Sequence, residues 1–368
     1  ELGILDAGTG NVSVTATAGS IIDVQDDLVD VDGDGFATNT SRTVNITGTN
    51  LRLNAAEEIG EADDPVDTMV DTLAANAGGA VYLYESDTLT IGTVAPVTVN
   101  RVALESTIAD VTDPADLVGV AATSYAKVET IDGSMTVDDA VAATSGDVLL
   151  AANGTGGDDD LVVNAAVTSG DNMSLLARDS VLQNANITSD TDGTEDDIGT
   201  IDVEAFSGSI IMDGDAVALT DNDNIRYTAE VDAGLGILNA GDAYVSVIAR
   251  TGRIYDAQGD TVGVDSEGFA TQTGDPRVVN IIANGMRVSA ALDLNDDGGT
   301  VDPLDTSLNT IAGVVGQSIY IYETDDLTIG TVPAVPVERV ALESTTATVT
   351  DAAPVSGLDA GTNAKVET

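Results

Sequence analysis

The chain of 368 residues contains no cysteine, histidine or tryptophan. Their absence excludes thiol nucleophiles, zinc sites, haem ligation and imidazole acid–base catalysis. The lack of cysteine does not place the chain in the cytosol. No run of 18 apolar residues exists, so the sequence predicts no membrane span. The chain begins at Glu1 without methionine or signal peptide, and we interpret it as a processed product or a window of a longer protein.

Basic residues are also scarce, with 12 Lys and Arg against 63 Asp and Glu and a formal net charge of −51. Such a charge excludes binding to a nucleic-acid backbone, which requires basic stripes. Aspartate outnumbers glutamate by 48 to 15, and aspartate favours turns and metal loops over helices. The composition therefore predicts many turns, high solubility and cation binding.

The chain is nevertheless apolar enough to fold, because hydrophobic residues make up 43% of it. They are mostly Val, Ile, Leu and Ala in short alternating runs, which argues against disorder. Expected strands have about four to seven residues, separated by Gly, Asp and Asn. Residues 66–76, "VDTMVDTLAAN", fit either one short helix or another strand.

Internal duplication is the most informative feature of the sequence. Segments of the first 130 residues return near the C-terminus, including "LGILDAG" (2–8) as "LGILNAG" (235–241), "GFATNT" (35–40) as "GFATQT" (268–273), "RVALEST" (101–107, repeated at 339–345) and "AKVET" (126–130, repeated at 364–368). The offset grows from 233 to 238 residues through insertions in Asp/Gly-rich loops. Insertions confined to loops are expected where strands build a fixed core.

We divide the chain accordingly into residues 1–130, the first copy, residues 131–233, an intervening β-rich segment of the same repeat unit, and residues 234–368, the second copy. This is one unit of about 238 residues and part of a second, so we expect the parent protein to be a longer array. Terminal coils of such an array stay unpaired unless capped, which predicts self-association with neighbouring repeats or chains.

Two all-β architectures fit this rhythm. One is a parallel β-helix, whose stacked coils bury small and β-branched side chains. The other is a series of immunoglobulin-like β-sandwiches of about 100 residues each with Asp-rich calcium linkers. Sandwiches usually need large aromatic anchors, and the chain has only three Phe, so the sequence favours the β-helix.

Several phrases resemble giant repetitive bacterial surface exoproteins of the filamentous-haemagglutinin type. They are "GNVSVTATAGSIIDV" (10–24), "NLRLNAAEEIG" (50–60) and "VYLYESDTLTIGTV" (81–94). The resemblance implies a right-handed parallel β-helix, secretion, and a role as an extracellular fibre or adhesin with surface or matrix ligands. It offers no catalytic residues.

An enzyme acting on acidic polysaccharides is a third hypothesis, because some β-helices cleave them with calcium-bound carboxylates beside a basic residue. The two lysines, Lys127 and Lys365, occupy one repeat position, and Arg101 and Arg339 occupy another. Alternation along a strand places each arginine on the same face as the glutamate four residues later. A salt bridge repeated in each unit is therefore the favoured interpretation, and we expect no enzyme activity.

Two segments resemble the start of a calcium loop. "DVDGDG" supplies Asp30, Asp32 and Asp34, and "DLNDDG" supplies Asp293, Asn295 and Asp297. Position twelve is Ser41 in the first and Leu304 in the second, where an EF-hand needs glutamate. We predict structural Ca²⁺ at these corners, as a staple on a scaffold. The sequence thus predicts a non-catalytic segment of a secreted surface fibre, sheath or adhesin stalk, with a calcium-dependent sandwich adhesin as the alternative.

Overall fold

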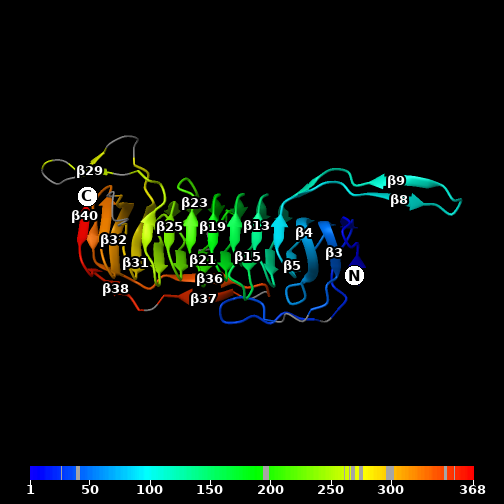
Figure 1. Ribbon diagram of the computed structural model, residues 1–368, viewed down its shortest axis with the longest axis horizontal. Coiled ribbons are helices and arrows are strands. Elements are labelled where there is room, and N and C mark those ends of the chain that lie inside the picture. Colours follow the sequence, from blue (N-terminus) through cyan, green and yellow to red (C-terminus); the bar gives the residue numbers. More distant parts are fainter. Residues whose placement is uncertain are drawn as a thin grey trace.

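The computed structural model describes residues 1–25, 27–38, 42–193, 199–260, 262–264, 266, 270–272, 277–295, 302–343, 346–351 and 353–368. These residues form strands, turns and irregular segments and no helix. Thirty strands belong to one sheet, in which neighbours pair in parallel. The all-β prediction is confirmed, and the architecture is consistent with a β-solenoid (Figure 1).

In the middle of the chain each turn contributes one strand to each of three parallel stacks. Stack A contains β5 (Val81–Glu85), β12 (Ala126–Thr130), β15 (Val148–Ala152), β18 (Met173–Ala177), β21 (Ile201–Ala205), β24 (Ile225–Ala229) and β27 (Tyr244–Ala249). Stack B contains β11 (Val120–Ala122), β14 (Val141–Ala143), β17 (Val167–Thr168), β20 (Ile187–Thr188), β23 (Val217–Leu219) and β26 (Ile237–Asn239). Stack C contains β6 (Leu89–Ile91), β13 (Met135–Val137), β16 (Leu161–Val163), β19 (Val181–Gln183), β22 (Ile210–Met212), β25 (Ala233–Leu235) and β28 (Ile254–Asp256).

Long strands replace the short ones at the start of each copy. Copy one opens with β1 (Leu5–Asp6), β2 (Val12–Ala16), β3 (Ile46–Ala55) and β4 (Val66–Ala77). Copy two continues with β31 (Ile281–Ala290), β32 (Leu304–Val315), β33 (Ile319–Glu323), β34 (Thr328–Ile329), β39 (Leu358–Ala360) and β40 (Ala364–Glu367). Residues 66–76 thus lie in a strand, not in a helix.

The core follows from the alternation of side chains along each strand. In stack A the in-register residues Val128, Leu150, Leu175, Val203 and Tyr227 point into the coil and are fully buried. Parallel register aligns apolar residues of successive turns, so they form one continuous cluster along the rod. Parallel stacking is incompatible with antiparallel sandwiches, and the alternative of tandem immunoglobulin-like domains is therefore wrong.

Each copy also carries an antiparallel hairpin, which we call its arm. The arm of copy one comprises β7 (Thr93–Val94), β8 (Thr98–Val102), β9 (Ile108–Thr112) and β10 (Leu117–Val118). The arm of copy two comprises β35 (Thr331–Val332), β36 (Pro336–Val340), β37 (Thr346–Thr350) and β38 (Val355–Ser356). A further antiparallel pair, β29 (Val262–Val264) and β30 (Ala270–Gln272), lies in the loop before β31.

The second copy continues the rod one stack further round than the first. β27 of stack A pairs with β31, β31 with β32, and β32 with β39. β39 is the copy-two counterpart of β11, which belongs to stack B. The two arms therefore leave the rod from different faces, as Figure 1 shows.

Candidate functional site

The first predicted calcium loop lies against the rod and already has a cationic partner. Asp32 Oδ2 is 2.7 Å from Arg178 Nη2, and Asp34 Oδ2 is 3.0 Å from Arg178 Nη1. Asp32 Oδ1 accepts hydrogen bonds from the Asp34 and Phe36 amides, as aspartate does in a tight turn. The exposed Asp30 accepts bonds from Thr38 through its backbone oxygen. A guanidinium thus supplies the counter-charge for two of these three carboxylates.

The second predicted loop is described only in part. Asp293 Oδ1 accepts a hydrogen bond from the Ser318 amide, and Asn295 adopts a positive φ of 59°. Asn295 Oδ1 accepts from the Asp256 amide, and its Nδ2 donates to the Asp302 carbonyl. Asp297 lies outside the described residues. Asn295 therefore stands beside a different acidic group, the copy-two cluster described below.

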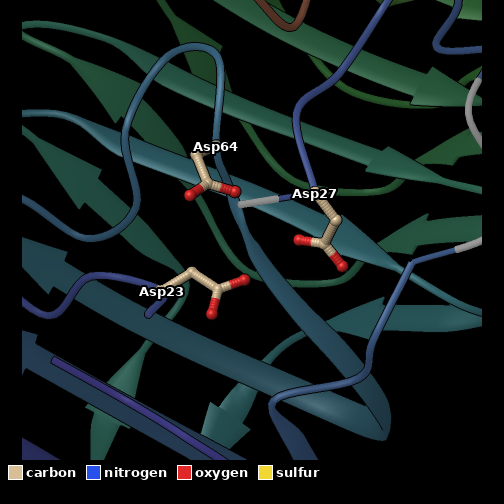
Figure 2. A group of neighbouring side chains, drawn as sticks. All are labelled: Asp23, Asp27 and Asp64. Carbon is tan, nitrogen blue, oxygen red and sulfur yellow. The ribbon is translucent and has the colours of Figure 1, made fainter. Parts of the chain in front are cut away.

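Three aspartates from two separate segments of the chain converge at the start of the first copy. Asp23, Asp27 and Asp64 each place a carboxylate oxygen within 4.8 Å of the others (Figure 2). Asp23 forms a parallel bridge with Leu2, Asp27 begins the loop 27–38, and Asp64 lies at the corner before β4. Asp23 and Asp64 are each only 8% exposed. We call Asp23, Asp27 and Asp64 the N-cluster.

Each aspartate of the N-cluster has one buried oxygen, namely Asp23 Oδ2, Asp27 Oδ1 and Asp64 Oδ1, that accepts no hydrogen bond from the described residues. Asp23 Oδ1 accepts from the Gln25 amide at 2.9 Å and from Asn45 Nδ2 at 2.6 Å. No donor among the described residues reaches Asp23 Oδ2. Arg42 lies beside the cluster, but it pairs closely with Asp67, at 2.6 Å, and its Nη2 is 3.6 Å from Asp27 and 3.7 Å from Asp64. Leaving a buried carboxylate oxygen unpaired is costly, so this atom points to a ligand.

Copy two repeats the whole arrangement. Asp256, Asp260 and Asp302 converge in the same way, and we call them the C-cluster. Asp256 Oδ1 accepts from Asn280 Nδ2 at 2.8 Å, while no described donor reaches Asp256 Oδ2. The neighbouring arginine pairs with an aspartate here too, as Arg277 with Asp305. Insertions have moved these residues by different offsets, and the geometry has survived them.

The electrostatics of both clusters disfavour full ionisation. Burial, together with the neighbouring Asp23, raises the pKa of Asp64 to about 6. Burial likewise raises the pKa of Asp67 to about 7, of Asp256 to about 7 and of Asp305 to about 6, against the opposing effect of hydrogen bonds and arginines. Crowded hard oxygen ligands suit Ca²⁺, which would replace the missing positive charge.

The sequence search missed both clusters because it looked for ligands two residues apart. Asp23 and Asp64 are separated by a whole turn of the rod, and only the fold brings them together. A usable signal existed in the duplication, because all three cluster positions are Asp in both copies. The neighbouring Asn45/Asn280 and Arg42/Arg277 are also unchanged between the copies.

The second notable site is the groove that receives the copy-two arm. It is lined by outward-facing residues of stack A and by the loop 27–38. This loop and the arm strands β36 and β37 run beneath the rod in Figure 1. Leu149, Leu176 and Phe36 pack there against Val340 and Leu342 of the arm. For this reason both faces of the stack A strands from β12 to β24 are buried.

Polar contacts fix the arm in this groove. Arg339 pairs with Asp202, at 2.7 Å, and with Glu204, and its Nη1 donates to the Asp34 carbonyl at 3.1 Å. Lys127 is 1% exposed, and its Nζ donates to the carbonyls of Ala341 at 2.8 Å and Glu343 at 3.0 Å. The expected pairing of Arg339 with Glu343 is therefore wrong, because the arm turns its arginine toward the preceding coils.

Comparison of the chain with models of protein families, with curated proteins and with solved structures finds no match. The described residues include no helix of the length and apolarity needed to cross a membrane.

Proposed function

We propose that the chain is a non-catalytic structural segment of a long, repetitive, secreted surface fibre, sheath or adhesin stalk, built as a right-handed parallel β-helix. The carrying observation is that copy two prolongs the stacks of copy one and folds its arm back over them. A unit that both stacks and clasps the preceding one can be repeated without limit. Right-handedness follows the general rule for parallel crossovers.

The surface chemistry supports a location outside the cell. A net charge of −51 keeps a long rod soluble and recruits cations, and calcium is plentiful there. The resemblance to filamentous-haemagglutinin-type exoproteins agrees with this, and surface or matrix molecules are the ligands it suggests. The proposed role is mechanical: the rod acts as a spacer of fixed length and presents its repeats.

Antibodies raised against the chain test this proposal on intact cells of the source organism. We expect them to label the surface in extended filaments, and the purified chain to release no product from acidic polysaccharides. Labelling only after lysis would contradict the location, and polysaccharide turnover would contradict the non-catalytic role.

We further propose that Ca²⁺ binds at the N-cluster and the C-cluster, as a structural staple at the start of each copy. Asp23 Oδ2 and Asp256 Oδ2 support this, because each is a buried acceptor that no described donor reaches. Calcium at the predicted loop residues remains a prediction, although Arg178 already pairs with Asp32 and Asp34.

Calcium titration distinguishes these sites. We expect two strong sites per chain by calorimetry, and at 100 times the dissociation constant about 2.7 kcal/mol of added stability per site. The double variant Asp23→Asn, Asp256→Asn should lose both. The matched variant Asp30→Asn, in the exposed part of the loop, should keep both of these cluster sites. Unchanged stoichiometry in the double variant, or no binding by the wild type, would refute the assignment.

A further inference from the structure

The arm of copy one carries the same contact residues as the docked arm of copy two, yet nothing described covers them. In copy two Val337 is 1% exposed and Val340 and Leu342 are fully buried. Their copy-one counterparts Val99, Val102 and Leu104 are 56%, 70% and 102% exposed. The heptapeptide "RVALEST" is identical in both arms, so the difference lies in the surroundings.

We infer that the copy-one arm is a docking element for a second copy of the repeat unit, stacked on the N-terminal end of the rod. Figure 1 shows β8 and β9 extending past that end, where the coils of such a unit would lie. The arm of copy two points the same way along the rod, and it contacts the coils formed by residues 127–233. The inference rests on the proposed function, because it supplies the joint between successive units of the fibre.

The base of the copy-one arm is already built for this joint. Asp113 accepts from Ser13 Oγ at 3.1 Å and from the Val97 amide at 2.9 Å, and pairs with Arg52 at 3.2 Å. Its counterpart Asp351 pairs with Arg287, the counterpart of Arg52, at 3.4 Å. The two bases are therefore held by the same pair of side chains.

A hollow lies at the base of the copy-one arm. A space of about 470 Å³ lies between β1, β2 and the arm base, lined by residues that include Leu5, Val12, Val97 and Val99. In copy two the preceding coil reaches the equivalent arm base: Arg226 pairs with Asp351 at 3.3 Å, and Asn224 Nδ2 donates to the Pro336 carbonyl at 2.8 Å. A preceding unit would supply the same two side chains.

Chemical complementarity identifies the partner of the copy-one arm as the groove of a second copy of the repeat unit, rather than a different protein. Arg101 would meet the acidic pair equivalent to Asp202 and Glu204, as Arg339 does. The carbonyls of Ala103 and Glu105 would accept from the equivalent of Lys127. Burying the Val and Leu side chains of the arm removes apolar surface from water, which favours docking within one rod.

The reverse face of the joint is present at the other end of the chain. Lys365 and Glu367 of β40 are the counterparts of Lys127 and Glu129 of β12. Lys365 is exposed, and its Nζ lies 4.8 Å from the centre of the Tyr320 ring. Lys127, by contrast, is buried beneath the arm tip. Copy two thus displays the first lysine of a groove for a further arm.

The full chain, extended in front of residue 1 by one more copy of residues 1–233, tests the inference by hydrogen exchange. The amides of Asn100 and Val102 are the counterparts of Glu338 and Val340, which donate to Thr200 Oγ1 and Ser174 Oγ at 2.8 Å each. We expect these amides to exchange at least about tenfold more slowly in the extended chain than in the original chain. Equal exchange in both would overturn the inference.

A matched variant separates docking from a general effect of length. The extended chain with Arg101→Glu and Leu104→Asp should exchange like the original chain at Asn100 and Val102. If this variant keeps the slow exchange, the groove is not the cause and the inference fails. The variant residues are exposed in the original chain, so its folding is not at risk.

Thiol reactivity gives a second measurement that does not depend on that variant. The chain has no cysteine, so Leu104→Cys introduces a single thiol. We expect it to react at least about tenfold more slowly in the extended chain than in the original chain. An unchanged rate would count against docking. A free arm would leave the fibre proposal standing, whereas absence of surface filaments would remove that proposal and leave docking intact.

Discussion

Replacing Arg339 with methionine should lower the free energy of unfolding by about 3 kcal/mol, because it removes one partner of a buried ion-pair network. Asp202 and Glu204, with side chains 0% and 3% exposed, would keep only Arg226 as a close buried partner, since Arg250 pairs with Glu204 from a half-exposed position. Although burial acts to raise it, Arg226 and Arg339 together lower the pKa of Glu204 to about 2. Urea unfolding followed by circular dichroism measures the loss.

The duplication supplies the control for this prediction. Arg101→Met changes the same residue of the same heptapeptide, but Arg101 is exposed and has no described ion pair. We expect its effect to stay within about 0.5 kcal/mol, as for most surface substitutions. Equal losses of unfolding free energy in the two variants would show that the arginine acts within its own arm. That result would contradict the proposed role of Arg339 in holding the arm against the preceding coils.

The second large effect is a fall in stability as the pH rises from about 5 to 8. Burial raises the pKa of Glu85 to about 8 and that of Glu129 to about 8, and Asp67 follows at about 7. A folded-state pKa above the unfolded value means that the folded state holds the proton more tightly. The resulting stability is complete below about pH 4.5 and is lost as the pH rises through the folded pKa.

Two other groups change the dependence of stability on pH outside the range from about pH 5 to 8. Glu204, whose pKa is lowered, stabilises the fold above about pH 4.5 and loses that contribution toward pH 2. Burial lowers the pKa of Lys127 to about 8, so its unfavourable charge in the folded state disappears as the pH rises from about 8 to 10.5. Stability should therefore be greatest near pH 5.

Urea titrations at pH 5 and pH 8 in metal-free buffer measure the effect. For Glu85 alone, fully buried, the difference is on the order of 4 kcal/mol. Glu85→Gln should flatten the curve, whereas Glu105→Gln in the exposed arm should leave it as in the wild type. A wild-type stability that rises between pH 5 and 8 would contradict the assigned protonation of these buried carboxyls.

The fold class could be predicted from the sequence because local residue patterns specify its strands and corners. Alternating Val, Ile and Leu between Gly and Asp corners specify short strands, and the scarcity of aromatics matches a narrow core filled by residues such as Val128 and Leu150. Residues 66–76 stayed ambiguous, because "VDTMVDTLAAN" fits two periods and only pairing of β4 with β3 and β5 decides between them.

The candidate sites were less accessible to sequence reasoning because they join residues far apart in the chain. Lys127 bonds to carbonyls 214 and 216 residues away, and no local pattern reports such a contact. Asp30, Asp32 and Asp34 have the spacing of a calcium loop, but Arg178 lies 144 to 146 residues further on and is invisible in that motif. Comparing the copies position by position would have shown that Asp23, Asp27 and Asp64 are among the aspartates kept in both copies.

Small-angle X-ray scattering from chains with one, two and three added copies of residues 1–233 tests the central claim most directly, namely that the units stack into one continuous, clasped rod. The account predicts that the maximum dimension grows by an equal increment with each copy while the cross-section stays constant, with turns spaced about 4.8 Å apart. Growth that falls off with copy number, or profiles of flexibly linked bodies, would contradict it.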